Sequence, residues 1–240
     1  AFWNAGWTVQ AFDRAHDDLA TAAQNNDVIV MGWNPLYPDW AAQMPGLHAT
    51  VQQAARASGS TVIVPGNVYV FDRNEPGPWG PNTAHAAQNS LGRLRAEMEQ
   101  SYRDSGVKTI VLRAGDFIDT EASDGWLDKV MLRGVAKGKF TYPGATDRAH
   151  AWAYLPDLAR AAVALAEQHQ DLPQFTDVAY AGYTLTAHDF ADALGVALGR
   201  LISVQKMSWL PVHLIRPFWP MARYLLEMRY LWDTAHQLNG

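Results

Sequence analysis

Four side chains with titratable groups lie in or just after stretches that are typical of strands. Tyr69 and Asp116 each follow a buried apolar stretch, and His150 and Tyr154 bound a short extended piece. Positioned side chains of these types act as general acids or bases, because each can exchange a proton with a reacting group. Tyr69, Asp116, His150 and Tyr154 are therefore the candidate catalytic residues, with no firm choice among them.

Several other kinds of site are excluded by what the chain lacks. Its 240 residues include no cysteine, which excludes disulfides, thiolate catalysis and zinc–thiolate sites. The histidines show no metal-ligand spacing, and no G-x-S-x-G occurs. We therefore predict no metal site.

The charge balance and the hydropathy narrow the range of partners. The net charge is −5 and no basic stripe interrupts it, which argues against nucleic acid. The chain has no run of about 18 apolar residues, and it does not begin with the layout of a signal peptide. We predict a cytoplasmic protein with a small-molecule substrate and no membrane partner, and the sequence allows a homo-oligomer.

Residues 61–116 predict one βαβ unit of a parallel sheet. A buried strand, a helix with spaced opposite charges and a second buried strand follow one another in this order. Residues 27–32 are a continuous apolar run, typical of a strand buried on both faces. We expect strands at 7–12, 27–32, 61–64, 108–113, 140–142, 150–154, 178–180 and 202–205, and helices at 17–24, 40–58, 83–105, 126–137, 158–169, 186–198 and most of 211–232.

The first residues predict the tail of a helix followed by a strand. Gly6 is suited to a left-handed helix cap, and residues 7–12 then read as a strand that ends at Asp13. In a dinucleotide-binding fold, a strand and a glycine-rich turn precede such a pair, and G-x-G-x-x-G occurs nowhere in the chain. We expect a doubly wound α/β sheet that lacks its first strand and turn, about 20 residues. The alternative is a natural N-terminal helix turn.

The segment around Tyr69 and the helix after it resemble the extended short-chain dehydrogenase/reductase family, of the epimerase/dehydratase-like kind. In that family a strand leads into S-S-x-x-V-Y-G, and a later helix carries Y-x-x-x-K. The pair Val68-Tyr69 matches the V-Y, and Leu91-Gly92 with Arg95 and Glu99 matches the helix. The resemblance extends from Gly6 to about Arg200 and implies a Rossmann-like fold that binds NAD or NADP.

The residues that carry the family's chemistry are replaced. Leu91 stands at the position of the catalytic tyrosine, Arg95 at that of the lysine, and Pro65-Gly66-Asn67 replaces the serines. Leucine cannot transfer a proton and arginine stays charged, so the usual Tyr/Lys/Ser mechanism is not available from these positions. Arg95 and Asn67 can still donate hydrogen bonds to a nucleotide.

The resemblance also implies which residues meet the cofactor. Asp13 suits the ribose 2′-OH of NAD and Arg14 the 2′-phosphate of NADP, so the choice of cofactor stays open. Gly32 lies at the end of a strand, where glycine lets the backbone approach a ligand closely. The predicted cofactor-binding residues are Asp13, Arg14, Gly32, Trp33, Asn34, Pro65, Gly66, Asn67, Arg95, Arg113, Ala114 and Gly115.

These observations predict an atypical NAD(P)-binding epimerase/dehydratase-like or reductase-like protein of unknown substrate, in which catalysis is not assured. The alternative is a catalytically inactive nucleotide-binding sensor or interaction protein on the same fold. A third interpretation is a non-redox enzyme that uses His150 or Asp116 as a base. We expect residues 1–120 to form the dinucleotide-binding core and residues 121–240 to form a mixed region that returns to the core and caps the substrate side.

Overall fold

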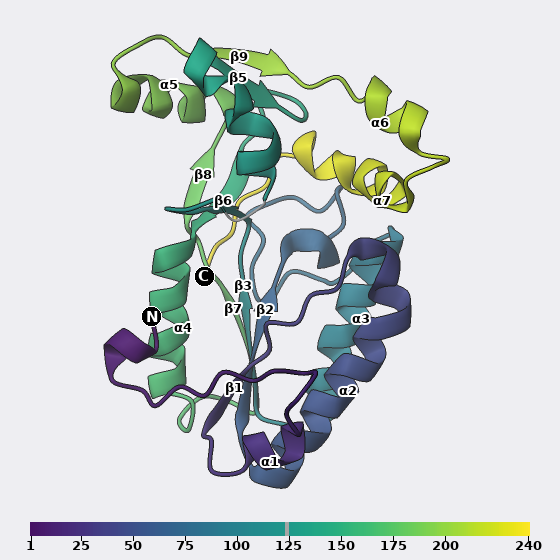
Figure 1. Ribbon diagram of the computed structural model, residues 1–240, viewed down its shortest axis with the longest axis vertical. Coiled ribbons are helices and arrows are strands. Elements are labelled where there is room, and N and C mark those ends of the chain that lie inside the picture. The colour runs from purple at the N-terminus through teal and green to yellow at the C-terminus, as the bar shows by residue number, and fades with distance from the viewer. Residues whose placement is uncertain (123–124) are drawn as a thin grey trace.

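A parallel β-sheet forms the centre of the computed structural model, which describes residues 1–122 and 125–240 (Figure 1). Each pair of neighbouring strands in this sheet runs parallel. Two of its strands and the helix between them form the predicted βαβ unit. The strands, in sheet order, are β1 (Val28–Val30), β2 (Thr61–Gly66), β3 (Thr109–Arg113) and β7 (Phe175–Ala179).

Helices cover both faces of this sheet (Figure 1). On β2, Val62 and Val64 belong to the core cluster that includes Leu91, whereas Ile63 packs into a cluster on the opposite face with Ile110. This alternation buries both faces of the strand, as its unbroken apolar sequence predicts. The doubly wound α/β fold is therefore confirmed. Helices α2 (Trp40–Ser58) and α3 (Ser90–Asp104) lie on one face and α4 (Leu155–Glu167) lies on the other.

Local sequence signals mark the ends of helices α2 and α3. Helix α2 has the predicted bounds, and the N–H of left-handed Gly59 donates to the Ala55 carbonyl oxygen at 2.8 Å. Helix α3 (Ser90–Asp104) lies within residues 83–105, the range expected to hold it. It begins after Asn89, whose side chain accepts a hydrogen bond from the Gly92 N–H at 2.7 Å and so caps the first turn.

The N-terminal region differs from the prediction. Gly6 is left-handed and ends a 3₁₀ turn, Trp3–Ala5, as expected, and helix α1 (Leu19–Ala23) follows later. Trp7–Phe12 pairs with no strand in the described chain, so the predicted strand there is wrong. Strand β1 was expected to be buried on both faces, but Val30 is 51% exposed, because β1 lies at the edge of the sheet.

A second group of elements lies beyond the carboxyl ends of the parallel strands (Figure 1). The predicted helix at 126–137 is a π turn, Leu127–Met131, followed by a 3₁₀ segment, Leu132–Lys137. Strands β4 and β8 were not predicted. This part contains a sheet of β4 (Asp116–Ile118), β6 (His150–Tyr154) and β8 (Tyr183–Leu185), a pair of β5 (Lys139–Tyr142) and β9 (Ser203–Lys206), and helices α5 (Ala187–Leu198), α6 (Leu210–Ile215) and α7 (Pro220–Met228).

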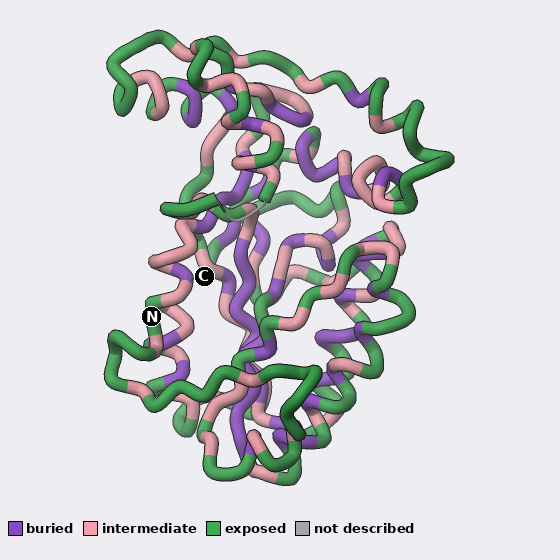
Figure 2. Tube along the Cα trace, in the orientation of Figure 1, coloured by how far each residue is buried: buried purple, intermediate pink, exposed green. Residues whose placement is uncertain are grey.

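The last residues of the chain return to the central sheet. A 3₁₀ segment, Arg229–Trp232, follows α7, and Leu231 and Leu238 join the core cluster between the sheet and its helices. Glu227 reaches the start of α3, where its carboxylate accepts a hydrogen bond from the Leu91 N–H at 3.0 Å. The C-terminal third therefore packs against the sheet, and Figure 2 shows the buried residues running through both parts.

Candidate functional site

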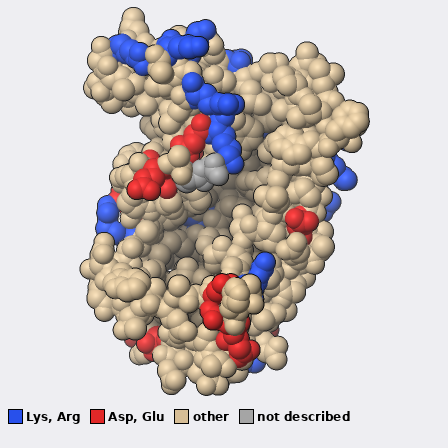
Figure 3. Space-filling model, in the orientation of Figure 1, with Lys and Arg blue, Asp and Glu red and all other residues tan. Residues whose placement is uncertain are grey.

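A cavity of about 430 Å³, here called the strand-end cavity, opens at the carboxyl ends of β1, β2 and β3. Figure 3 shows the molecular surface hollowed between the parallel sheet and the upper elements. In open α/β sheets, ligands bind outside the carboxyl ends of the strands. The lining residues are Met31, Gly32, Trp33, Asn34, Tyr37, Trp40, His48, Val64, Pro65, Gly66, Asn67, Val68, Tyr69, Arg95, Ala114, Gly115, Asp116, Phe117, Leu155 and Leu158.

Most of the predicted cofactor residues meet in this cavity, although they come from four separate segments. The predicted residues that do not line it are Asp13, Arg14 and Arg113. The carboxylate of Asp13 closes its own turn, because it accepts hydrogen bonds from the Ala15 N–H and from His16 Nδ1, both at 2.8 Å. The bond to His16 lowers the pKa of Asp13. The Arg14 guanidinium lies 5.5 Å from the ring of Trp33, at the rim of the cavity.

Arg113 lies in a buried ion-pair cluster, which differs from its predicted contact with a cofactor. Its guanidinium donates to Glu99 Oε2 at 2.7 Å and to Asp177 Oδ2 at 2.6 Å, and its side chain is fully buried. Burial alone would lower the pKa of Arg113, but the two carboxylates raise it. Glu99, Asp177 and His85 could otherwise hold a cation, yet the Arg113 guanidinium already supplies the positive charge there.

Arg95 is held at the wall of the strand-end cavity by α3. Its guanidinium lies 4.5 Å from the ring of Trp40 and donates to Asn34 Oδ1 at 3.0 Å. Its Nε is buried and has no hydrogen-bond partner among the described residues. Burial lowers the pKa of Arg95, but arginine stays protonated in proteins. Arg95 therefore presents a positive charge to the cavity, and its Nε–H group is still able to donate a hydrogen bond.

Two tyrosines form a hydrogen-bonded pair in the cavity. The hydroxyl groups of Tyr37 and Tyr69 lie 2.7 Å apart. Burial raises the pKa of Tyr69 well above its ordinary value, and the nearby Tyr37 and Asp116 raise it further, against the opposing effect of Arg95. Tyr69 thus lines the cavity, in an environment that keeps its hydroxyl proton in place.

Asp116 and His150 form a second polar pair at the boundary between the two groups of elements. Asp116 Oδ2 and His150 Nε2 lie 2.7 Å apart, with His150 buried and Asp116 lining the cavity. The imidazole of His150 stacks on Trp232 with ring centroids 4.4 Å apart. Tyr154 is at the N-cap of α4 and does not line the cavity. The arrangement brings Asp116 to the site and places His150 behind it.

The position that resembles the family's catalytic tyrosine is filled by core packing. Leu91 is fully buried and belongs to the cluster between α3 and the sheet. The next residue, Gly92, is required by a close approach, because a Cβ there would collide with the Tyr69 carbonyl oxygen. Glycine is required at position 115 for a similar reason, because a Cβ there would collide with the Ala151 carbonyl oxygen. These glycines bring segments of the chain together, whereas a Cβ at Gly32 would meet open space.

Sequence reasoning missed several residues of the cavity, including His48 and Tyr37. His48 Nδ1 lies 3.0 Å from the Tyr102 hydroxyl, and burial together with the charge of Arg95 lowers the pKa of His48 to about 4. His48 lies in the middle of α2, where nothing in the local sequence marks it as a site residue. Tyr37 lies in the run N-P-L-Y-P, whose aromatic residue between two prolines was the available signal.

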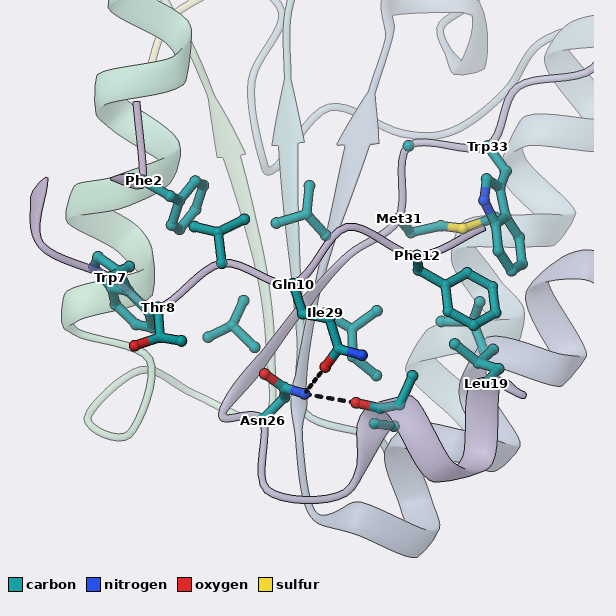
Figure 4. Close-up of a pocket in the computed structure, with 17 residues that line it drawn as sticks. Phe2, Trp7, Thr8, Gln10, Phe12, Leu19, Asn26, Ile29, Met31 and Trp33 are labelled. Carbon is teal, nitrogen blue, oxygen red and sulfur yellow. Dashed lines mark hydrogen bonds between the residues drawn. The ribbon is translucent and has the colours of Figure 1, made fainter. Parts of the chain in front are cut away.

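A second cavity, here called the outer slot, lies between Trp7–Phe12 and the open edge of β1 (Figure 4). Its volume is also about 430 Å³. Apolar side chains such as Phe12 and Ile29 line most of it, and Asn26 donates across it to Gln10 Oε1 at 3.5 Å. The outer slot has the dimensions of a small ligand site but few groups that could recognise a polar molecule.

The sequence matches the RmlD substrate binding domain family over residues 42–212. No curated protein sequence matches the chain. Solved structures with the same fold include a nucleoside-diphosphate-sugar epimerase from Staphylococcus aureus, with 17% identity, a TM-score of 0.63, and coverage of 89% of this chain and 68% of that one.

Two further structures show the same likeness. One is a dTDP-glucose 4,6-dehydratase from Streptomyces venezuelae with NAD and TYD bound, with 16% identity, a TM-score of 0.60, and coverage of 79% of this chain and 63% of that one. The other is a UDP-glucose 4-epimerase from Brucella ovis in complex with NAD, with 15% identity, a TM-score of 0.63, and coverage of 79% and 69%. The chain thus spans about two thirds of the length of these proteins, and they share its fold.

Proposed function

Because the chain belongs to the RmlD substrate binding domain family, we propose that it is an NAD(P)-binding protein of the epimerase/dehydratase type. The strand-end cavity would take the nicotinamide end of the dinucleotide together with a small hydroxyl or carbonyl compound, such as the sugar of a sugar nucleotide. Structural neighbours crystallised with NAD support this proposal. Residues 1–120 would supply most of the nucleotide side, and residues 121–240 the substrate side.

The observation that carries the proposal is the position of Arg95. It occupies the place that resembles the family's ribose-binding lysine, and it lies at the carboxyl ends of parallel strands. Its buried Nε has no partner among the described residues, which fits a site built for an additional acceptor. A ribose hydroxyl or a phosphate oxygen provides such an acceptor, and the guanidinium suits both.

The remaining lining fits a dinucleotide as well. Open space above Gly32 leaves room for a ligand beside the backbone, and Asn34 already orients Arg95. The bound nicotinamide would supply or accept a hydride. Asp13 and Arg14 keep the choice between NAD and NADP open, since Asp13 is engaged in its own turn and Arg14 lies beside Trp33.

The second candidate function is a catalytically silent nucleotide-binding protein. Leu91 replaces the proton donor and is fully buried, and burial raises the pKa of Tyr69 rather than lowering it toward neutrality. A general acid–base catalyst works best when its pKa lies near the working pH. These two observations favour binding without turnover.

Two measurements separate these proposals. Calorimetric titration with NAD and with NADP tests binding. Weak but saturable binding of one of them is expected, because the chain contains no G-x-G-x-x-G to hold the pyrophosphate. Absorbance of the reduced nicotinamide in the presence of sugar nucleotides then tests hydride transfer. Binding with hydride transfer supports the enzyme, and binding without it supports the silent protein. Absence of binding by both dinucleotides contradicts both proposals.

A further inference from the structure

The segment around α6 is the most exposed apolar part of the upper elements. All residues from 213 to 220, H-L-I-R-P-F-W-P, are exposed. Phe218 is 88% exposed and Leu214 is 67% exposed. Single apolar residues on a surface need no explanation, but a contiguous group marks an interaction site. We call Leu210, Leu214, Ile215, Phe218 and Trp219 the α6 wedge.

The α6 wedge is held in place by the elements beneath it. Trp209, just before α6, is buried and its Nε1 donates to the Pro143 carbonyl oxygen at 2.6 Å. The N–H groups of Phe218 and Trp219 both donate to the Ile215 carbonyl oxygen, at 2.9 and 3.0 Å. These bonds fold the connection after α6 into a tight turn. Figure 1 shows α6 and this turn projecting from the rest of the molecule, and Figure 2 shows the turn exposed.

The charged residues in the segment that carries the wedge are all positive. No Asp or Glu occurs in residues 193–226, although the whole chain has 24 acidic and 19 basic residues. Lys206, Arg216 and Arg223 lie in this stretch and are exposed. Interfaces between proteins have an apolar core and a polar rim, whereas the charged residues of this segment are cations only. A projecting apolar wedge with basic residues beside it matches the surface of an anionic bilayer, where phosphate groups lie above a region of apolar acyl chains.

We propose that the α6 wedge docks on the surface of an anionic lipid bilayer. Phe218, Trp219 and Leu214 would enter the boundary between headgroups and acyl chains, and Arg216 and Arg223 would meet lipid phosphates. No described helix is long and apolar enough to cross a membrane, so the contact would be peripheral. The dinucleotide site at the carboxyl ends of the sheet would then operate close to a membrane surface, and the proposal stands whether or not that site is catalytic.

Sedimentation with vesicles tests the docking. The protein should sediment with vesicles of phosphatidylcholine and phosphatidylglycerol in equal amounts, much less with phosphatidylcholine alone, and less as salt is raised. The double variant Phe218→Asp, Trp219→Asp should reduce binding at least about tenfold, because two charges replace the rings that enter the bilayer. Arg216→Gln with Arg223→Gln should remove most of the preference for the anionic vesicles.

The matched control is Trp3→Asp. Trp3 is 73% exposed at the N-terminal turn, which lies on the opposite side of the view in Figure 1 from α6. This variant should bind vesicles as the unchanged protein does, and thermal unfolding should show that every variant folds. The proposal is overturned if the unchanged protein does not bind anionic vesicles. It is also overturned if the double variant Phe218→Asp, Trp219→Asp binds as well as the control Trp3→Asp. It is also overturned if light scattering shows that the wedge instead joins two copies of the chain.

Discussion

The ion-pair cluster around Arg113 and the cavity wall around Arg95 present the same residue type in two different situations. Both guanidinium groups are buried, and both lie over an aromatic ring, Phe71 for Arg113 and Trp40 for Arg95. Arg113 donates to two carboxylates. Among the described residues, no carboxylate lies within ion-pair distance of Arg95, which donates to an amide oxygen.

The difference shows what makes a buried arginine structural. Where the fold supplies the anions, the positive charge is already compensated and the pKa rises, as at Arg113. Where the fold leaves the charge without an anion, burial lowers the pKa, as at Arg95. A buried charge is costly unless it is paired, so Arg95 retains an affinity for an external anion or hydroxyl that Arg113 has already satisfied.

Removal of the Arg113 side chain should have the largest effect. Arg113→Met keeps the volume but leaves Glu99 and Asp177 buried and facing each other. Breaking a buried pair by removing one partner costs roughly 3–5 kcal/mol of the free energy of unfolding. Urea denaturation measures this loss. The triple variant Arg113→Met, Glu99→Gln, Asp177→Asn removes the charges together and should recover much of it; an equally unstable triple variant would contradict the ion-pair account.

Acid should weaken the fold through His48, beside Arg95. The pKa of His48 is about 4 in the folded protein, against an ordinary value of 6.5, so the unfolded chain takes up its proton first as pH falls. The contribution of His48 to the free energy of unfolding is therefore fully present above about pH 6.5. It is lost as pH falls toward 4, by roughly 3 kcal/mol in total. Denaturant unfolding across this range measures the slope.

His48→Gln should flatten that slope, because glutamine does not titrate. His236, whose pKa burial lowers to about 3, should leave a residual dependence in the same direction. The exposed His213 supplies the matched control, and His213→Gln should leave the slope unchanged. A slope that does not respond to His48→Gln would mean that His48 is not buried in its neutral form.

Arg95→Ala should change binding more than stability. If the guanidinium meets the ribose or a phosphate, loss of a charge-assisted hydrogen bond costs roughly 1.5–3 kcal/mol, or about a tenfold to hundredfold rise in the Kd for the dinucleotide. Arg93→Ala is the control, since Arg93 lies on the exposed side of the same helix. Normal binding by Arg95→Ala in calorimetry would refute the proposed contact.

Tyr69→Phe should have the smallest effect. It removes the hydrogen bond to Tyr37 and should lower the free energy of unfolding by about 1 kcal/mol, with binding of dinucleotide largely kept. If the protein transfers hydride, comparison of turnover and binding in this variant decides the role of Tyr69. Unchanged turnover assigns Tyr69 to the wall of the cavity, and lost turnover with intact binding makes it the proton donor.

Much of the fold could be predicted because its signals are local. The Thr186 and Asp189 capping box begins α5, and a left-handed Gly199 ends it, both as the sequence indicates. Strands β4 and β8 were missed because each has only three residues and neither is a continuous aliphatic run like β1. The Trp7–Phe12 segment has the composition of a strand, but a strand exists only when a partner accepts its hydrogen bonds.

Part of the site could also be predicted. Residues that end strands, such as Asn34 and Asn67, were found because parallel strands bring their carboxyl ends together. The ion pair between Arg113 and Asp177 could not be predicted, because the two residues are 64 positions apart in the chain and no local pattern connects them. His48, on α2, and Tyr37, in the 3₁₀ turn just before α2, line the cavity because of tertiary packing that no local pattern shows.

The open edge of β1 has a consequence for the behaviour of the protein in concentrated solution. Its three residues, V-I-V, carry no charge, and Val30 is half exposed beside the apolar outer slot. Proteins usually protect such edges with lysine, proline or a covering segment, because an unpaired strand is a template for edge-to-edge association. Here the covering segment, Trp7–Phe12, lies across the slot without pairing. The β1 edge is thus a site at which edge-to-edge association between molecules of this chain is expected, and a lysine in place of Val30 is the simplest change that would oppose it.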